Sequence, residues 1–218
     1  MIATLNGQLS ANCGQRAERE YQPSPALSRR LALEGIQSFS LFELPSGLRH
    51  AERFRSMVVD ARASHGALGA CLHLYRDSEY TTMRLFSDAD GMAGFALNGQ
   101  EVVSVFCHKD RRKRHATRTM MELAVMLGGI FLNAFDTFLP AVYGRCGFKP
   151  VARMAWDDHQ APDGWDYEAA LRFSGGRPDV VFMTYTSRRP TVARVGSFEA
   201  GELLQRLAAN TDFIEVTL

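Results

Sequence analysis

The chain has 218 residues, 46% of them apolar, and its 25 lysines and arginines nearly balance its 24 acidic residues. This length suits one domain of about 150–200 residues with an appendage. The net charge of +1 is far below that of a protein that coats a polyanion, which argues against nucleic acid as a partner. The sequence has no stretch apolar and long enough to predict a membrane span. The N-terminus lacks the basic and apolar regions of a secretory signal. The four cysteines form no CxxC pair, which indicates reduced thiols and a cytoplasmic location: Cys13, Cys71, Cys107 and Cys146.

Two segments of opposite charge lie within this balanced total. Residues 109–118 hold six basic residues and one acidic residue, whereas residues 154–171 hold five acidic residues and no lysine or arginine. Charge runs are usually solvated surface, so each segment gains a functional meaning only from its place among the predicted elements.

The first half of the chain predicts a helix pair followed by a strand meander. Residues 1–30 are polar, contain two prolines and predict weak order. A strand is expected over residues 35–44, a helix over 48–64 capped by Ser46, and a shorter helix over 68–75. Three strands follow, over residues 82–86, 92–97 and 101–107. The turn Asn98-Gly99 makes the last two antiparallel neighbours.

The second half alternates strands and helices. A helix that begins near Ala116 and ends at Gly128-Gly129 is expected, because its apolar residues cover most of its faces. A buried strand (130–135), a short helix (138–146), two strands (148–156 and 179–186), and a final helix (198–209) with a terminal strand follow. This order mixes a hairpin meander with two strand–helix crossovers. It predicts an α/β fold with a mixed, mostly antiparallel sheet and helices on both faces.

The basic segment lies between a strand and the first turn of a helix. Such a turn offers unpaired N–H groups and the positive end of the helix dipole, and nearby arginines add charge. The arrangement predicts an anion site that suits a diphosphate, although a basic helix start that contacts only water has the same sequence.

Residues 132–156 closely resemble the second half of the GNAT N-acyltransferase fold. In that superfamily a strand leads to a short helix with a tyrosine, and a Gly-Phe pair then opens the next strand; Tyr143 and Gly147-Phe148 match this pattern. The predicted order of elements matches the family over residues 35–187. The resemblance implies a domain over residues 35–189, between an N-terminal extension (1–34) and a C-terminal appendage (190–218).

The resemblance also implies an activity and a set of site residues. GNAT enzymes transfer the acyl group of acetyl-CoA, or of another acyl-CoA, to an amine by direct attack in a ternary complex. Tyr143 would protonate the departing thiolate, a role that suits a phenol with a pKa near 10. Asn133 would contact the cofactor or substrate. The pantetheine arm of CoA would be bound by Val103, Ser104, Val105 and Phe106. The diphosphate of CoA would be bound by Arg112, Lys113, Arg114, His115, Ala116 and Thr117.

The general base that removes the proton of the amine is open among three residues. Asp136 follows the strand before the tyrosine helix and is the favoured candidate, although an aspartate there can simply cap that helix. Glu101 begins the strand that would line the cleft, and His108 ends it.

The acidic segment is a candidate acceptor site. In the resembling fold the connection between the last two strands helps to frame the acceptor pocket, so Asp157, Asp158 and Trp156 would attract a cationic small-molecule or protein amine. The alternative is a solvated loop. No ligand spacing predicts a metal site.

One departure from the family keeps other functions open. The diphosphate loop of GNAT enzymes usually contains glycines, and residues 112–117 contain none. The alternatives are a catalytically weak or inactive GNAT-like binding protein and a GNAT-like protein that modifies nucleic acid. The oligomeric state is also open, with a homodimer among the alternatives.

Overall fold

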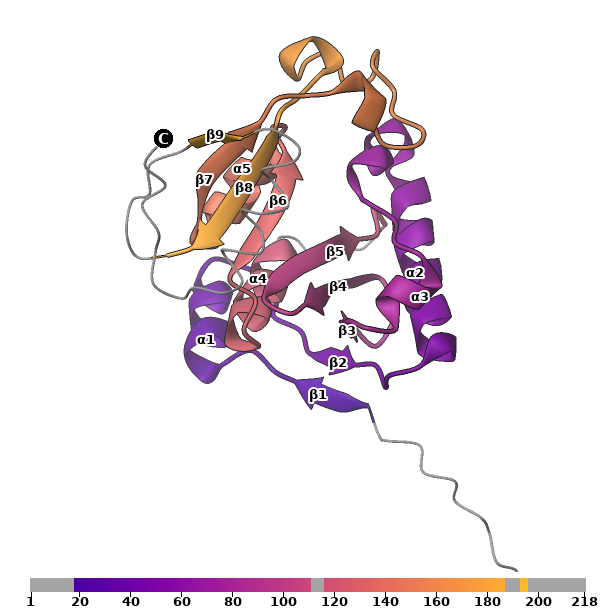
Figure 1. Ribbon diagram of the computed structural model, residues 1–218. Coiled ribbons are helices and arrows are strands. Elements are labelled where there is room, and N and C mark those ends of the chain that lie inside the picture. The colour runs from indigo at the N-terminus through magenta and orange to yellow at the C-terminus, as the bar shows by residue number, and fades with distance from the viewer. Residues whose placement is uncertain (1–17, 111–115, 187–192, 196–218) are drawn as a thin grey trace, which may run out of the picture.

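A single mixed sheet runs through the molecule (Figure 1). The computed structural model describes residues 18–110 and 116–186 and the backbone of 193–195. In this part of the chain the strand order is β1-β2-β3-β4-β5-β6-β8-β7-β9, and only the β5–β6 and β7–β9 pairs are parallel. The strands are β1 (Arg19–Tyr21), β2 (Leu41–Glu43), β3 (Arg84–Ser87), β4 (Ala93–Asn98), β5 (Glu101–Cys107), β6 (Phe131–Phe135), β7 (Phe148–Met154), β8 (Val180–Tyr185) and β9 (Ala193–Val195).

Helices cover both faces of this sheet, as the sequence predicts. On one face, α2 (Leu48–Ser64) and α3 (Asp77–Tyr80) pack through a core that includes Phe54, Val58 and Phe106. On the other face, α4 (Ala116–Met126) and α5 (Leu139–Gly144) pack through a second core that includes Met120 and Phe148. The predicted α/β class with a mostly antiparallel sheet is confirmed.

Several predicted boundaries agree with the structure. Helix α2 and strand β5 span the predicted residues, and α4 begins at Ala116. Helix α2 buries Ala51, Phe54, Val58 and Ala61, which recur every three or four residues and form one apolar stripe. The β4–β5 hairpin is also present, but its two-residue loop is Gly99-Gln100, one position later than predicted, because Asn98 still pairs with Glu101. Gly99 has a φ of 59°, which suits the first position of a tight hairpin turn.

Other predicted elements differ from the structure. The strand predicted over residues 35–44 is shortened to β2, and the helix predicted over residues 68–75 is replaced by a 3₁₀ helix, Gly66–Cys71, followed by extended chain. A side chain at Gly69 would place its Cβ 2.0 Å from the carbonyl oxygen of Arg62, so this turn packs directly on the end of α2. Gly47, and not Ser46, occupies the N-cap position of α2. The helix predicted over residues 198–209 lies outside the described residues.

The prediction of weak order over residues 1–30 is wrong for residues 18–30, the part of this segment that the structure describes. Strand β1 pairs with β2, and α1 (Pro25–Leu33) docks beside α4 through ion pairs Arg30–Glu122 and Glu34–Arg118. Pro25 is the first residue of α1, a position that proline favours. The N-cap residue before it is Ser24, whose Oγ accepts a hydrogen bond from the Leu27 amide at 3.1 Å.

Replacement of Leu31 by Ala is expected to lower the free energy of unfolding by about 2–4 kcal/mol, because Leu31 is fully buried with Leu27 and Ile36. Urea denaturation followed by circular dichroism measures this change. The matched control is Leu33→Ala in the same helix: Leu33 is 85% exposed, so this change is expected to cost less than about 0.5 kcal/mol. Equal effects of the two substitutions would contradict the docking of α1.

Candidate functional site

Strands β5 and β6 are joined at their first residues and separate beyond them. The two strands are parallel neighbours, yet among the described residues their only backbone pairing joins Glu101 to Phe131. The carbonyl of Gln100 also accepts a hydrogen bond from the Ile130 amide at 2.9 Å. Because the two strands share so short a ladder, they diverge toward their carboxyl ends (Figure 1), and a cleft lined by residues of both strands lies there.

A β-bulge in β5 shapes one wall of this cleft. Ala96 pairs with Val103 and Gly94 pairs with Phe106, so β5 has one residue more than β4 in this interval. Ser104 has a φ of 48°, and its Oγ lies 2.8 Å from the hydroxyl oxygen of Tyr80 in a buried hydrogen bond. The bulge leaves backbone groups of β5 out of the ladder with β4, beside the cleft.

The cleft encloses a cavity of about 450 Å³ that both sheet faces line. The predicted pantetheine-binding residues Val103, Ser104, Val105 and Phe106 all line it, together with Asn133, Tyr143 and Thr117. Its volume lies in the range of small-molecule sites. The structure therefore gathers residues of β5, β6, α4 and α5 that are distant in the sequence around one cavity.

Tyr143 faces this cavity from α5. The side chain is 7% exposed, and burial raises the pKa of the Tyr143 phenol well above its usual value near 10. The phenol therefore keeps its proton over the whole physiological pH range and is available as a proton donor.

Glu101 and Asn133 connect the two walls at the closed end of the cleft. The Asn133 Nδ2 donates a hydrogen bond to the Glu101 Oε1 at 3.0 Å. Burial raises the pKa of the Glu101 carboxyl to about 7, and the Asn133 hydrogen bond opposes this rise. A carboxyl with a pKa near 7 is suited to proton transfer at neutral pH. The sequence places Glu101 at the start of a strand, but its burial depends on residues elsewhere in the chain.

The other two base candidates have different surroundings. The carboxylate of Asp136 is paired with the Arg153 guanidinium and does not line the cavity. His108 lines the cavity, and its Nδ1 accepts a hydrogen bond from the Asp110 amide at 3.2 Å.

The predicted diphosphate site is described only in part. Helix α4 begins at Ala116, and Thr117 in its first turn lines the cavity. The first-turn N–H groups of a helix have no partner within the helix and can bind an anion. Arg112, Lys113, Arg114 and His115 lie outside the described residues.

The acidic connection between β7 and β8 is held by its own contacts. Asp157 accepts hydrogen bonds from the His159 amide (2.9 Å) and Gln160 Nε2 (3.3 Å). The Asp158 carboxylate accepts hydrogen bonds from Trp156 Nε1, the Tyr167 hydroxyl and Arg177 Nε at 2.8–3.0 Å. These bonds lower the pKa of Asp158. Both predicted acceptor-binding carboxylates therefore already have partners within the connection.

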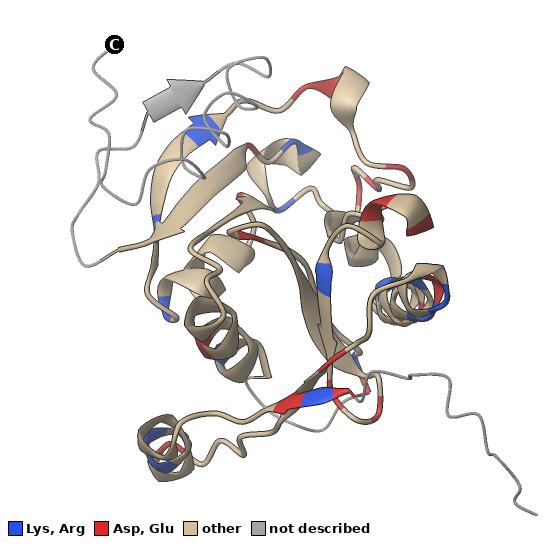
Figure 2. Ribbon diagram, turned by 60° about the horizontal axis from the view of Figure 1, so that its bottom comes forward, with Lys and Arg blue, Asp and Glu red and all other residues tan. Residues whose placement is uncertain are grey.

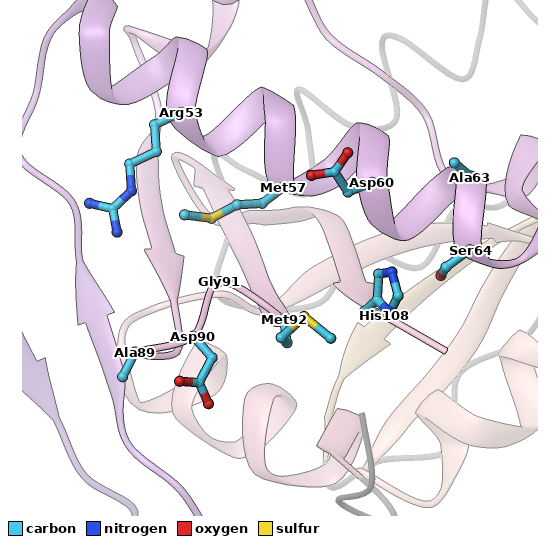
Figure 3. A pocket seen from close by; sticks show the side chains of 10 residues that line it. All are labelled: Arg53, Met57, Asp60, Ala63, Ser64, Ala89, Asp90, Gly91, Met92 and His108. Carbon is cyan, nitrogen blue, oxygen red and sulfur yellow. The ribbon is translucent and has the colours of Figure 1, made fainter. Parts of the chain in front are cut away.

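A second hollow, of about 580 Å³, lies between α2 and the turn that joins β3 to β4 (Figure 3). Arg53, Met57 and Asp60 project from α2 toward Asp90 of the turn. The hollow carries charges of both signs, and His108 lines it as well as the cavity. Figure 2 shows that charges concentrate on helices such as α1 and α2, whereas most of the central strands carry none.

In the described ranges, no three histidine, cysteine, aspartate or glutamate side chains gather as a metal site would require. No helix in the same ranges has the length and apolarity needed to cross a membrane.

Comparison with known proteins gives one weak likeness. The chain is similar to the solution structure of apo-form YjaB from Escherichia coli, with 17% sequence identity and a TM-score of 0.41, over 63% of this chain and 94% of that one. No protein-family model matches the chain, and no curated protein is significantly similar to it. A likeness at this level indicates no activity.

Proposed function

We propose that the protein is a GNAT-type N-acyltransferase that moves an acetyl or other acyl group from acyl-CoA to an amine. The observation that carries this proposal is the split between β5 and β6: a bulged strand and a buried, protonated tyrosine line its cavity, and a carboxyl with a pKa near 7 lies at its closed end, hydrogen-bonded to Asn133 of the cavity lining. These are the groups that aminolysis of a thioester needs: a slot for an extended chain, an acid and a base.

In the proposed reaction the amine nitrogen attacks the thioester carbonyl carbon. A C–N bond forms and the C–S bond breaks, which gives an amide and the CoA thiolate. The ionised Glu101 takes the proton that the nitrogen loses, and the Tyr143 hydroxyl gives its proton to the thiolate sulfur. Solvent then returns a proton from Glu101 to Tyr143, so the enzyme is regenerated.

Glu101 is preferred to Asp136 as the base. The Asp136 carboxylate is already engaged in an ion pair with the Arg153 guanidinium. Glu101 has no basic partner among the described residues, and it is held by the amide of Asn133 beside the cavity. Asp136 then has a structural role at the end of β6.

The co-substrate would extend from the bulge of β5 to the first turn of α4. The unpaired backbone groups beside Ser104 suit the amides of a pantetheine arm, and the N–H groups beside Thr117 suit a phosphate. Titration calorimetry with acetyl-CoA tests this. We expect saturable binding with one site, and absence of heat and of thermal stabilisation at millimolar acetyl-CoA would overturn the proposed function.

A further inference from the structure

The charged residues that line the cavity are basic in the part of the chain that the structure describes. Arg62 and Lys109 carry positive charge, three histidines join them, and no aspartate or glutamate lines the cavity. A polycationic acceptor would be repelled by this wall, and an anionic group would be attracted to it. Lys109 begins the basic segment that is predicted to bind the diphosphate, so its charge suits the acyl-CoA. Arg62 is not part of that segment, so its charge suits a different ligand group.

Arg62 lies on the sheet face opposite the proposed diphosphate site. It is in the last turn of α2, whose apolar stripe packs on the sheet face opposite α4. Its Nη2 donates a hydrogen bond to the carbonyl oxygen of Asp163, so Arg62 lies where α2 meets the β7–β8 connection. The helix terminus proposed for the diphosphate is on the other face.

The guanidinium of Arg62 retains donors for a ligand. Arginine has five N–H donors in a planar fork, and one of them is bonded to Asp163. No carboxylate of the described chain lies within ion-pair distance of Arg62, although α2 holds other arginines that are paired, such as Arg53 with Glu18 and Arg55 with Asp77. The backbone carbonyl fixes the side chain without neutralising it.

His73 and Tyr75 line the cavity together with Arg62. The pKa of His73 is lowered mainly by burial; Glu79 and Asp163 oppose this effect, and the charge of Arg62 adds to it. The His73 ring contacts the Tyr75 ring edge-on, with centroids 4.4 Å apart. Tyr75 in turn is close enough to Glu101 for that carboxylate to raise the pKa of its phenol, after the larger effect of burial. Glu101 lies outside the lining itself and accepts a hydrogen bond from Asn133, which lines the cavity.

We propose that Arg62 binds a carboxylate of the acceptor, so that the acceptor is a small amine that also carries a carboxylate, as an α-amino acid does. This inference rests on the proposed function. A carboxylate on Arg62 would direct the amino group along the His73–Tyr75 wall toward Glu101. Arginine recognises carboxylates through two parallel hydrogen bonds, which adds geometric selectivity to charge.

The test compares amino acids with their decarboxylated amines in a CoA-release assay with acetyl-CoA. The panel is the common L-amino acids, the matched amines (phenethylamine for phenylalanine, 3-methylbutylamine for leucine) and spermidine. We expect turnover of one or more amino acids at a kcat/KM at least about 10-fold above that of the matched amine, since a hydrogen bond to a charged group contributes about 1.5–3 kcal/mol.

Two variants separate recognition of the acceptor from other roles of Arg62. Arg62→Gln is expected to raise KM for the amino acid about 10- to 100-fold while the Kd for acetyl-CoA changes less than about two-fold. The control Arg49→Gln removes the same charge from the exposed start of α2 and is expected to leave both constants unchanged. Arg62→Lys keeps the charge and is expected to recover part of the loss.

The outcomes are distinguishable. If Arg62→Gln weakens acetyl-CoA and leaves the acceptor KM unchanged, Arg62 binds the co-substrate and the inference is overturned. Preference for spermidine or the decarboxylated amines, or binding of acetyl-CoA without turnover of any amino acid, overturns the inference but leaves the proposed function standing. Failure to bind acetyl-CoA overturns the proposed function itself.

Discussion

Glu101→Gln is expected to lower kcat/KM for acyl transfer by about 100- to 1,000-fold, the usual contribution of a general base. Glutamine keeps the size of the side chain and still offers an oxygen to Asn133 Nδ2, so the loss would come from the missing proton acceptor. Initial rates of CoA release, measured with saturating acetyl-CoA, give the comparison. The matched control is Glu52→Gln, an exposed glutamate of α2, which is expected to act like the parent protein.

The pH profile adds a sharper test of the same residue. The pKa of the Glu101 carboxyl is raised to about 7, and the base is active only when ionised. The parent kcat/KM is therefore expected to rise with pH and level off above about 7, and this limb should be absent in Glu101→Gln. A parent profile that is flat between pH 5 and 8, with full activity in the variant, would assign the base elsewhere, with Asp136 as the next residue to test.

Glu101→Gln is expected to lower kcat/KM but to raise the free energy of unfolding. The native carboxyl has a pKa of about 7 against 4.5 for an ordinary glutamate, so between these values the folded state binds more protons than the unfolded state. Its contribution to stability therefore falls as pH rises from about 4.5 to 7. We expect Glu101→Gln to raise the free energy of unfolding by about 1–3 kcal/mol at pH 8 and by much less at pH 5. Urea titrations at the two pH values measure the difference.

Tyr143→Phe is expected to lower kcat by about 10- to 1,000-fold while the Kd for acetyl-CoA changes less than about two-fold. The phenylalanine ring fills the same space in the core and lacks only the hydroxyl that protonates the thiolate. Because burial raises the pKa of Tyr143 well above 10, the parent protein should show no loss of activity from this group as pH rises to 9.

The control for this variant is Tyr185→Phe, at a tyrosine 46% exposed and outside the cavity. Single-turnover measurements of CoA release separate the chemical step from product release. Equal rates for Tyr143→Phe and the parent protein would remove Tyr143 from the reaction and leave it as a packed core residue.

Local patterns account for the elements that the sequence predicted well. Helix α2 is encoded by apolar residues at helical spacing, and the β4–β5 hairpin by a glycine turn between two apolar runs. The pattern of α4, which is apolar on most of its faces, reflects a helix packed on a sheet, and Gly128 with a φ of 98° follows its end.

Features that depend on distant contacts could not be predicted. The residue that bulges from β5 is fixed by Tyr80, 24 positions earlier, which hydrogen-bonds to Ser104. The 3₁₀ turn around Gly69 depends on close packing against the Arg62 backbone. The two prolines before residue 30 contributed to the prediction of weak order, although Pro25 occupies the first position of α1, where a proline is well tolerated.

The residues of the candidate site also divide into those that local patterns predicted and those that depend on distant contacts. The family resemblance indicated Val103 to Phe106 of β5 and Tyr143 of α5, which line the cavity, because a family pattern of strand, helix, tyrosine and glycine is local; it did not indicate Val102, Cys107, Leu139 or Val142, which line it too. It did not rank Glu101 above Asp136, since the pairing of Asp136 with Arg153 and the burial of Glu101 arise only when β5, β6 and β7 come together.

The place where β5 meets β6 has a mechanical consequence. Strands β1 to β5 and strands β6 to β9 form two half-sheets, and in the described chain the backbone of Gln100 and Glu101 joins them to Ile130 and Phe131. The proposed base thus sits on the seam itself. If the half-sheets rock apart or together when a substrate enters, the cleft widens or narrows around a pivot, and the carboxylate at the pivot moves least. Removal of the amine proton by Glu101 would then depend little on how far the cleft opens to admit the acyl chain.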